Sequence, residues 1–329
     1  MSLNPTSSSE SREALVPATV TELARFLAAN AQRERRPLLP VGGRTSLGFG
    51  VSPVDNSLEV TTSRLDAVVD YPARDMTVTV QAGCRVSQLQ AQLATEKQRL
   101  PVDVPLSHRA TIGGAVAADT AGPRRLGFGT LRDYVIGISC VTADGRSFKA
   151  GGRVVKNVAG YDLCKLMVGS AGTLSVVTEV TLKLKPLPES SALGWVCLDR
   201  GDVVEDILGD LVLSRARPVA IELLGPHAGR SVAAESRIVL PEGPLLLGVG
   251  LEGSRGEVEW QCDVISRELE AGGAGEVVWV TGDDARKQWG VLTDFQVGVD
   301  APVTIRASLL PSKTVGWVTA AIDAGVSVQ

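Results

Sequence analysis

The stretch between Pro105 and Val180 is poor in side-chain bulk, and this feature constrains the fold more than any other. Within it, glycines and small residues alternate with a few charged ones, as in the runs TIGGAVAADTAG and VGSAGTLSVV. A glycine leaves its backbone N–H group uncovered and tolerates positive φ angles. Successive turns of this kind suit a long phosphate-bearing molecule that lies along the backbone. The stretch therefore predicts a site for a nucleotide cofactor.

The chain is long enough for two domains, because it has 329 residues of which 44% are hydrophobic. All five tryptophans follow residue 190, whereas all three tyrosines precede it. The run KLKPLPESS at residues 183–191 contains two prolines and ends a β-like stretch, so the break is expected there. We therefore expect a disordered tail over residues 1–16, a first domain over 17–187 and a second over 192–329.

Charge and hydropathy narrow the class of protein. The 33 basic and 37 acidic residues give a net charge of −4, which argues against binding to nucleic acid and requires an anionic cofactor to be held by local groups. No apolar run has the length of a signal sequence or of a membrane span, so a cytoplasmic protein without direct membrane insertion is expected. The five cysteines are odd in number and far apart, which predicts free, buried thiols and no metal site.

Hydrophobic periodicity predicts an α+β first domain. Thr19 and Glu22 form a capping box for a helix with Leu23 and Leu27 on its apolar face. A second helix is expected where Val86, Leu89 and Leu93 share a face. Strands are expected over residues 38–41, 76–80, 136–141 and 174–184, and a glycine- and hydroxyl-rich turn over 42–50.

In the second domain, Gly248, Gly250 and Gly253 match the spacing of a dinucleotide fingerprint. That fingerprint requires glycines that open a helix directly after a strand. Here the alternation of GVGLE continues a strand, and the helix is expected only over residues 256–270. The pattern predicts a strand, a helix and the strand GEVVWV in an α/β cap domain, with no binding of NAD.

Three runs resemble, in this order, the FAD-binding domain of the vanillyl-alcohol oxidase and p-cresol methylhydroxylase flavoproteins. They are PVGGRTSLG, ATIGGAVAADTAGPRRLGFGTLRDYVIGISCVTADGR and KNVAGYDLCKLMVGSAGTLSVVTEVTLKLKP. Within that family the chain is most similar to the small FAD-binding subunits of bacterial glycolate oxidases. The resemblance implies a PCMH-type FAD-binding domain of two subdomains, followed by a smaller α/β cap domain.

The resemblance also implies which residues contact FAD. The first run wraps the pyrophosphate, the second passes the flavin, and the third lies near the adenine and ribose. The usual position of a covalent flavin link is Arg44 here, not histidine or cysteine, so FAD is expected to be non-covalent. In the second run, relatives often have Asn or Ser where this chain has Asp119 and Thr120, which leaves side-chain donors there open. The expected cofactor-binding residues are Val41, Gly42, Gly43, Arg44, Thr45, Ser46, Pro105, Thr111, Gly113, Gly114, Ala117, Ala118, Asp119, Gly122, Gly169, Gly172, Val176 and Val177.

For function, the resemblance implies hydride transfer from a 2-hydroxy acid to the flavin, within a glycolate oxidase complex. A larger FAD-linked subunit and an iron–sulfur subunit are the expected partners, and any link to the inner membrane runs through them. Two alternatives stay open: a stand-alone oxidoreductase of a small hydroxy acid or alcohol, and a flavin-bearing assembly or electron-transfer subunit without its own substrate. Only two histidines are present, too few for the metal cluster of larger relatives, which favours a subunit role.

The catalytic residue is not identified from the sequence. The candidates are Tyr161, His108, and Arg306 in an expected strand TIRASLLP. Tyr161 is equally consistent with a packed aromatic beside a turn, and an exposed loop is the favoured position of His108. His227 is expected in a surface turn. One of Arg124, Arg125 and Arg132 is expected beside the flavin, or each lies on a solvated turn. Other carboxylate-binding candidates in the cap are Arg286, Lys287, Trp289 and Lys313.

Overall fold

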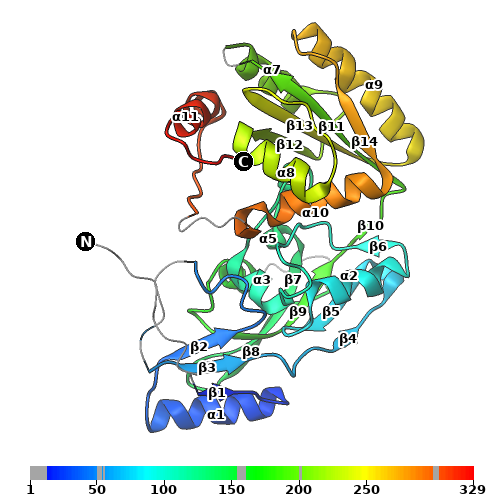
Figure 1. Cartoon of the computed structure of the whole chain (residues 1–329). Helices are drawn as coiled ribbons and strands as arrows, with labels where there is room; N and C mark the ends of the chain where they lie inside the picture. Colours follow the sequence, from blue (N-terminus) through cyan, green and yellow to red (C-terminus); the bar gives the residue numbers. More distant parts are fainter. Residues whose placement is uncertain (1–12, 50–53, 55, 154–160, 200–201, 299–303) are drawn as a thin grey trace. The chain divides into compact units, whose positions relative to one another are not determined.

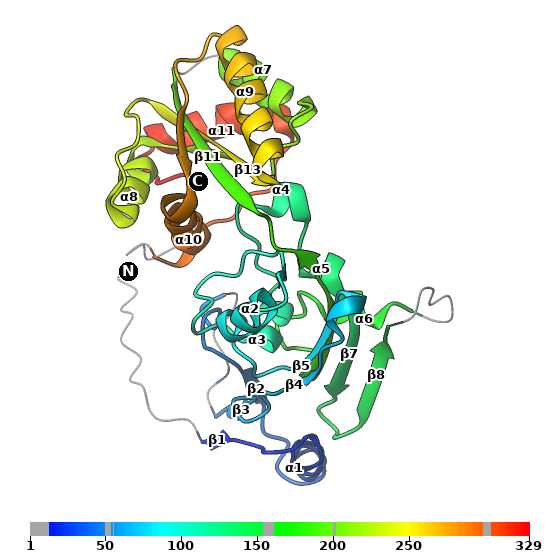
Figure 2. The same cartoon turned by 90° about the vertical axis from the view of Figure 1, so that its right-hand side faces the viewer.

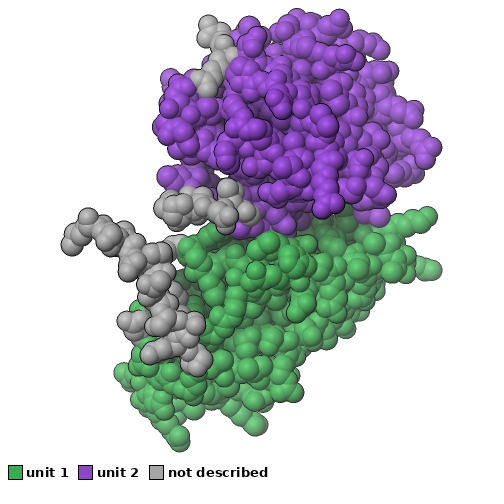
Figure 3. Space-filling view, viewed as in Figure 1, with its two compact units in different colours: residues 1–100, 106–120, 131–185 green, residues 101–105, 121–130, 186–329 purple. Residues whose placement is uncertain are grey.

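The computed structural model describes residues 13–49, 54, 56–153, 161–199, 202–298 and 304–329. The chain divides into two compact units, which Figure 3 shows in different colours. The first unit comprises residues 1–100, 106–120 and 131–185, and the second comprises 101–105, 121–130 and 186–329. None of the described helices has the length and apolar character that crossing a bilayer requires.

The first unit contains two larger sheets (Figures 1 and 2). A parallel sheet has the order β1-β3-β2, and an antiparallel sheet has the order β4-β5-β9-β7-β8. The strands of the first sheet are β1 (Ala14–Leu15), β2 (Leu38–Val41) and β3 (Leu58–Thr61). Those of the second are β4 (Val68–Asp70), β5 (Thr77–Gln81), β7 (Val135–Val141), β8 (Ser147–Gly151) and β9 (Val176–Lys183).

The helices of this unit are α1 (Val20–Gln32), the 3₁₀ turn η1 (Ala73–Asp75), α2 (Val86–Ala94), α3 (Ile112–Ala118), α5 (Leu131–Tyr134) and α6 (Leu163–Met167). The two-residue strands β6 (Gln98–Arg99) and β10 (Lys185–Pro186) pair with each other in a small separate sheet. The expected strands and both expected helices are present, with boundaries shifted by one or two residues.

Helix α1 forms where its cap and apolar face were expected. The Thr19 hydroxyl accepts a hydrogen bond from the Glu22 N–H at 3.1 Å. Leu23 and Leu27 are fully buried, in a cluster with Val60 of β3 and Val141 of β7. The helix therefore packs where the two sheets of the first unit meet.

The prediction of a disordered tail over residues 1–16 is wrong for its last residues. Residues 1–12 lie outside the described residues, but Ala14 and Leu15 form β1 and pair with Glu59 and Val60 of β3. A parallel edge strand forms here because β3 offers an unpaired edge on the side away from β2.

The second unit is a three-layer α/β domain around an antiparallel sheet of order β12-β13-β11-β14. Its strands are β11 (Ser190–Leu198), β12 (Ala220–Leu224), β13 (Leu245–Gly253) and β14 (Val278–Thr281). Its helices are α4 (Arg125–Phe128), α7 (Asp202–Leu213), α8 (Pro226–Ser236), α9 (Arg255–Ala271), α10 (Gly282–Gly298) and α11 (Pro311–Asp323).

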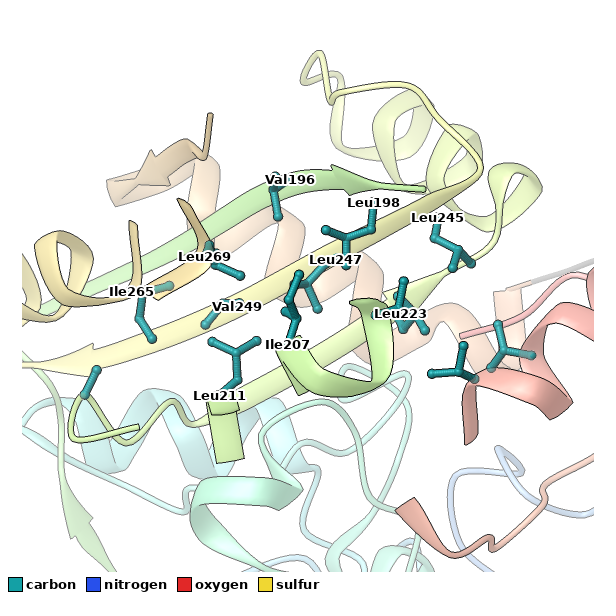
Figure 4. Packing of buried hydrophobic residues seen from close by; sticks show 14 of the residues in the cluster. Val196, Leu198, Ile207, Leu211, Leu223, Leu245, Leu247, Val249, Ile265 and Leu269 are labelled. Carbon is teal, nitrogen blue, oxygen red and sulfur yellow. The ribbon is translucent and has the colours of Figure 1, made fainter. Parts of the chain in front are cut away.

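Two apolar clusters cover the two faces of this sheet. Helices α7, α9 and α11 pack on one face, where Ile207, Leu211 and Ile265 meet Leu247 and Val249 (Figure 4). Helices α8 and α10 pack on the other face around the buried Trp195. Successive residues of β13 point to opposite faces, so covering both faces buries the strand from Leu245 to Leu251.

Three sequence expectations for the second unit need correction. Residues 304–310 form no strand, so Arg306 lies in an irregular segment. His227 is exposed, but it lies in the first turn of α8, because Gly225 caps that helix and Pro226 occupies its first position. Residues 101–105 and 121–130 belong to this unit rather than to the first, because Asp103 and Arg124 join an ion-pair network with Glu252 of β13.

The glycines of the apparent dinucleotide fingerprint lie in the strand β13, as expected. A Cβ atom on Gly248 would lie 2.7 Å from Cζ3 of Trp195, and one on Gly250 would lie 2.2 Å from Cη2 of Trp289. These glycines make room for the two indole rings against the sheet. The spacing thus reflects packing of tryptophans and not recognition of a phosphate.

Replacing Gly250 by alanine is expected to lower the free energy of unfolding of the second unit by about 1–3 kcal/mol, because the new methyl group overpacks the buried Trp289. Denaturant unfolding followed by tryptophan fluorescence measures this, since all five tryptophans lie in this unit. Gly290→Ala is the matched control, because no atom lies within 4 Å of its added Cβ. Equal stability of the two variants would contradict the packing role.

Candidate functional site

Three segments far apart in the sequence meet in the first unit. They are the loop after β2, the start of α3 and the loop after α6. A Cβ atom on Gly42 would lie 2.1 Å from Oγ1 of Thr111, and one on Gly172 would lie 3.5 Å from Cγ of Pro40. The Gly169 N–H donates to the Val116 carbonyl at 2.9 Å. The structure therefore brings together the first-unit parts of all three predicted runs.

A pocket of about 390 Å³ opens beside the first loop, within the range of roughly 300–1,000 Å³ that small-molecule sites occupy. Four of the predicted residues line it: Gly42, Gly43, Arg44 and Thr111. The remaining lining residues were missed by the sequence interpretation; they are Ser63, Asp66, Gly83, Arg85, Gln88 and Arg109. Gly83 could have been found from the sequence as the glycine that follows the strand β5, whereas the charged lining residues form no recognisable pattern.

The glycines of the pocket are required by close backbone approaches. A Cβ atom on Gly43 would lie 1.9 Å from the carbonyl oxygen of Arg109, and one on Gly83 would lie 2.0 Å from that of Thr62. Any other residue at these positions would displace a neighbouring main chain. The first loop is therefore held tightly against the segment that leads into α3.

The first loop also presents backbone donors. In the part of the chain that the structure describes, the N–H groups of residues 43–46 make no hydrogen bond to another residue. Such a series of free amides in a turn is a favourable site for an anion. The prediction that this loop holds phosphate thus fits the donors that the fold leaves available.

Arg44 contributes its main chain to this loop, while its side chain has another partner. Its guanidinium forms a bidentate ion pair with Glu59 of β3, with 3.2 Å between Nη1 and Oε1. The Glu59 side chain is only 8% exposed. Because a buried carboxylate is costly without a cation, Arg44 both neutralises Glu59 and ties the loop to β3. The residue itself adopts a left-handed φ of 58°.

Replacing Arg44 by methionine is expected to destabilise the first unit by about 1–3 kcal/mol, because it leaves the Glu59 carboxylate buried without its cation. Adding Glu59→Gln should restore part of the loss, since the amide carries no charge. Hydrogen exchange at residues 58–61 of β3 measures the local effect in both variants. If the double variant is as unstable as the single one, the ion pair does not carry the effect.

The second predicted run combines packing with one available donor. The Thr111 hydroxyl caps α3 by accepting from the Gly114 N–H at 3.3 Å, so its own O–H remains able to donate. The Gly113 N–H donates to the Ala82 carbonyl at 2.7 Å. A Cβ atom on Gly113 would lie 2.6 Å from that of Ala82. Gly113 is thus a packing residue, whereas Gly114 is half-buried and Thr111, although only 6% exposed, lines the pocket.

The third run supports the end of α3. Asp119 ends that helix in a left-handed conformation, and the Ala171 N–H donates to the Ala117 carbonyl at 2.8 Å. Ala118, between them, is the last residue of the helix. The side chains of Val176 and Val177 are buried in the central strand β9, and Val176 belongs to the α1 core cluster. Only the main chain of these valines is therefore available to a ligand.

Pro105 and Gly122 are not part of this first-unit cluster. Both belong to the second unit, where a Cβ atom on Gly122 would lie 2.6 Å from that of Asp103. Arg124 is also in that unit, and its guanidinium binds Asp103 and Glu252 and stacks on Trp289 at 4.9 Å. Arg124 is thus a structural cation. Arg125 is exposed, and Arg132 donates to the Lys165 carbonyl.

The three catalytic candidates do not line the pocket. Tyr161 is 95% exposed, and His108 and Arg306 are also exposed. Asp162 caps α6 by accepting from the Lys165 N–H. Lys156, Asn157 and Gly160 of the third run lie outside the described residues.

The carboxylate-binding candidates of the second unit separate into two groups. Trp289 is buried and donates from Nε1 to the Ser191 hydroxyl at 2.9 Å. Arg286 and Lys287 pair with Asp283 and Asp284 on the exposed side of α10. Lys313 is exposed at the start of α11. Arg286 and Lys287 are therefore held by carboxylates of their own helix turn on the exposed side, whereas the Trp289 ring is buried. These side chains do not form one shared binding site.

The cysteines are free, and those at positions 84, 140 and 164 are buried, whereas Cys197 and Cys262 are half-buried. Burial raises the pKa of the Cys140 thiol to about 11. It raises the pKa of Cys262, with the nearby Asp263, to about 11 as well. These thiols are protonated near neutral pH, which makes them poor nucleophiles.

Comparison with known proteins agrees with this geometry. The model of the FAD binding domain family matches residues 13–151. Glycolate oxidase subunit GlcD of Bacillus subtilis (strain 168) is 32% identical over 229 residues, which cover 69% of this chain and 48% of that protein. Glycolate oxidase subunit GlcE of Escherichia coli (strain K12) is 34% identical over 189 residues, which cover 57% of this chain and 52% of that protein.

The chain thus spans about half the length of these curated relatives. Among solved structures, p-cresol methylhydroxylase with substrate bound matches with a TM-score of 0.68 at 15% sequence identity. The match covers 86% of this chain and 62% of that one. At this identity the likeness shows the fold, which is a PCMH-type FAD-binding fold followed by an α/β domain.

Proposed function

We propose that this chain, which carries an FAD binding domain of the p-cresol methylhydroxylase type in residues 13–151, is a flavin-bearing subunit of a 2-hydroxy acid oxidase or dehydrogenase. The observation that carries the proposal is the loop of residues 43–46. Its N–H groups make no hydrogen bond within the described residues, and its first two members, Gly43 and Arg44, line a pocket together with other close-packed glycines. Two phosphate groups need such donors in a chain with a net charge of −4.

The residues present fit FAD. The amides of the first loop would hold its diphosphate, and the Thr111 hydroxyl would add one donor. When bound, the flavin ring supplies the acceptor for a hydride from the α-carbon of the substrate. In this proposal the chain contributes binding and orientation, and the Arg44–Glu59 ion pair keeps the loop in place.

Attachment of FAD is proposed to be non-covalent. The residues that line the pocket include neither histidine nor cysteine. The Arg44 side chain, at the family's attachment position, pairs with Glu59. Denaturation of the purified protein in acid should therefore release all of its flavin into the supernatant, whereas yellow colour in the pellet would contradict this part of the proposal.

The substrate class and the partners are proposed from the relatives. GlcD and GlcE are named as glycolate oxidase subunits, and glycolate is a 2-hydroxy acid. We accordingly propose a complex with a larger FAD-linked subunit and an iron–sulfur subunit that accepts electrons. Any attachment of the complex to a membrane is proposed to run through these partners.

A subunit without its own substrate is the second candidate function. It is favoured by the exposure of Tyr161, His108 and Arg306, none of which lines the pocket. In that case the chain would bear flavin for assembly or electron transfer, and the oxidation would take place on a partner.

One experiment tests both candidates. The full chain is purified, its visible spectrum is recorded, and glycolate or D-lactate is added without oxygen. Bleaching of the flavin band supports oxidation by this chain alone, and a stable yellow spectrum supports the partner role. A colourless protein that takes up no added FAD under native conditions would refute the proposed function.

A further inference from the structure

We propose that the guanidinium groups of Arg85 and Arg109 bind the diphosphate of the flavin dinucleotide, beside the free amides of residues 43–46. This inference rests on the proposed function, and it assigns the positive charge of the site to two residues outside the three resembling runs of glycines. Both side chains line the pocket.

The first step of the argument is the charge of the pocket. Its charged lining residues are Arg44, Arg85, Arg109 and Asp66. Arg44 is neutralised by Glu59. Neither Arg85 nor Arg109 has a side-chain hydrogen bond or ion pair with any residue in the described ranges. The pocket therefore keeps two uncommitted guanidinium groups against one carboxylate, an excess of positive charge that favours an anionic ligand.

The second step is that the backbone places both arginines at one site. Arg85 forms an isolated antiparallel bridge with Thr111, and the Val86 N–H donates to the Ala110 carbonyl at 2.9 Å. The Arg109 N–H donates to the Leu106 carbonyl at 2.7 Å. These bonds fix the two segments side by side. Because the backbone of the site is already ordered in the folded chain, a ligand loses less binding free energy to ordering it.

The third step joins the arginines to the amides. A Cβ atom added to Gly43 would lie only 1.9 Å from the carbonyl oxygen of Arg109. The segment that carries Arg109 and the loop that carries the free N–H groups are thus in direct van der Waals contact. Arginine donates in a planar fork that matches two phosphate oxygens. Backbone amides would thus give a diphosphate hydrogen-bond donors, and the two guanidinium groups would add donors that also carry positive charge.

Asp66 provides a test in which binding should change in the opposite direction. Its side chain lines the same pocket. Burial raises the pKa of the neighbouring Cys84 thiol, and the negative charge of Asp66 adds to this effect. A phosphate bound by Arg85 and Arg109 would be repelled by this carboxylate. Removing the charge of Asp66 should therefore strengthen binding, whereas removing that of either arginine should weaken it.

The test uses the full chain after co-purified flavin has been removed, with Kd values for FAD and for ADP measured by titration calorimetry at low and at high salt. Arg85→Gln and Arg109→Gln should each weaken binding of both ligands by about tenfold, because charge-assisted hydrogen bonds are lost. The loss should shrink at high salt. Asp66→Asn should tighten binding by a few-fold. Arg25→Gln, on an exposed position of α1 outside the pocket, is the control with the same charge change.

The outcomes separate this inference from the proposed function. If the unchanged chain binds neither FAD nor ADP, the proposed function fails. If it binds FAD but Arg85→Gln and Arg109→Gln behave like Arg25→Gln, the function stands and this inference is overturned. Weaker binding of FAD with unchanged binding of ADP also overturns it, because the diphosphate is common to both ligands.

Discussion

Replacing Gly43 by alanine is expected to weaken FAD binding about 100-fold or more and to leave the purified protein colourless. The added Cβ would lie 1.9 Å from the carbonyl oxygen of Arg109 and 2.6 Å from its carbon. Both atoms belong to main chain, which cannot swing aside as a side chain does. The loop must therefore move away from the segment before α3, and the amides of residues 43–46 lose their common position.

Gly48→Ala is the matched control for this prediction. It lies in the same loop, and no atom lies within 4 Å of its added Cβ. This variant should bind FAD as the unchanged chain does. The flavin content after purification and the Kd for added FAD measure both variants. A Gly43→Ala protein that retains its flavin would show that the close approach to Arg109 does not position the amides of residues 43–46 for FAD.

Replacing Arg124 by methionine is expected to lower the free energy of unfolding of the second unit by about 3–5 kcal/mol. The side chains of Asp103 and Glu252 are 1% and 3% exposed, and both bind this guanidinium. Burial disfavours the charge of Arg124, but the two carboxylates outweigh it and raise the pKa of Arg124 above its ordinary value. Without the arginine, two negative charges stay buried without the cation that they share.

Tryptophan fluorescence during urea unfolding measures this loss, because the tryptophans report on the second unit. Arg286→Met is the control: its ion pair with Asp283 is about three-quarters exposed on both sides, and such pairs contribute about 0.2–1 kcal/mol. Adding Asp103→Asn to Arg124→Met should recover part of the stability. If Arg124→Met and Arg286→Met lose equally little, the buried network does not hold residues 101–105 and 121–130 in the second unit.

The local elements of the first unit could be predicted because each depends on neighbouring residues. The cap at Thr19, the apolar face of α2 and the alternation of β5 are signals within a few positions of the chain. The same holds for β13, where alternation correctly outweighed the spacing of three glycines. The composition of residues 304–310 predicts a strand, but the segment is irregular, because β propensity alone does not supply a partner strand.

The candidate site was predictable only in part. Its glycines stood out, since a missing Cβ is visible in the sequence whatever it touches. Arg85, Arg109 and Asp66 did not, because a charged residue has the same appearance on a solvated surface and in a pocket. The role of Arg124 is hidden for the same reason. The sequence allows a place beside the flavin or on a solvated turn, whereas the side chain binds Glu252, which lies 128 positions away.

The cap and apolar faces of α1 and α2, the strands β2, β5, β7, β9 and β13 and the glycine-rich loop after β2 were thus written into local patterns of side-chain size and hydropathy. Tertiary structure alone decided which charges are paired and which stay available: Arg44 binds Glu59, Arg124 binds Asp103 and Glu252, and Arg85 and Arg109 remain uncommitted at the pocket. The physical reason is that an ion pair depends on distance in space and on burial, and neither follows from separation along the chain.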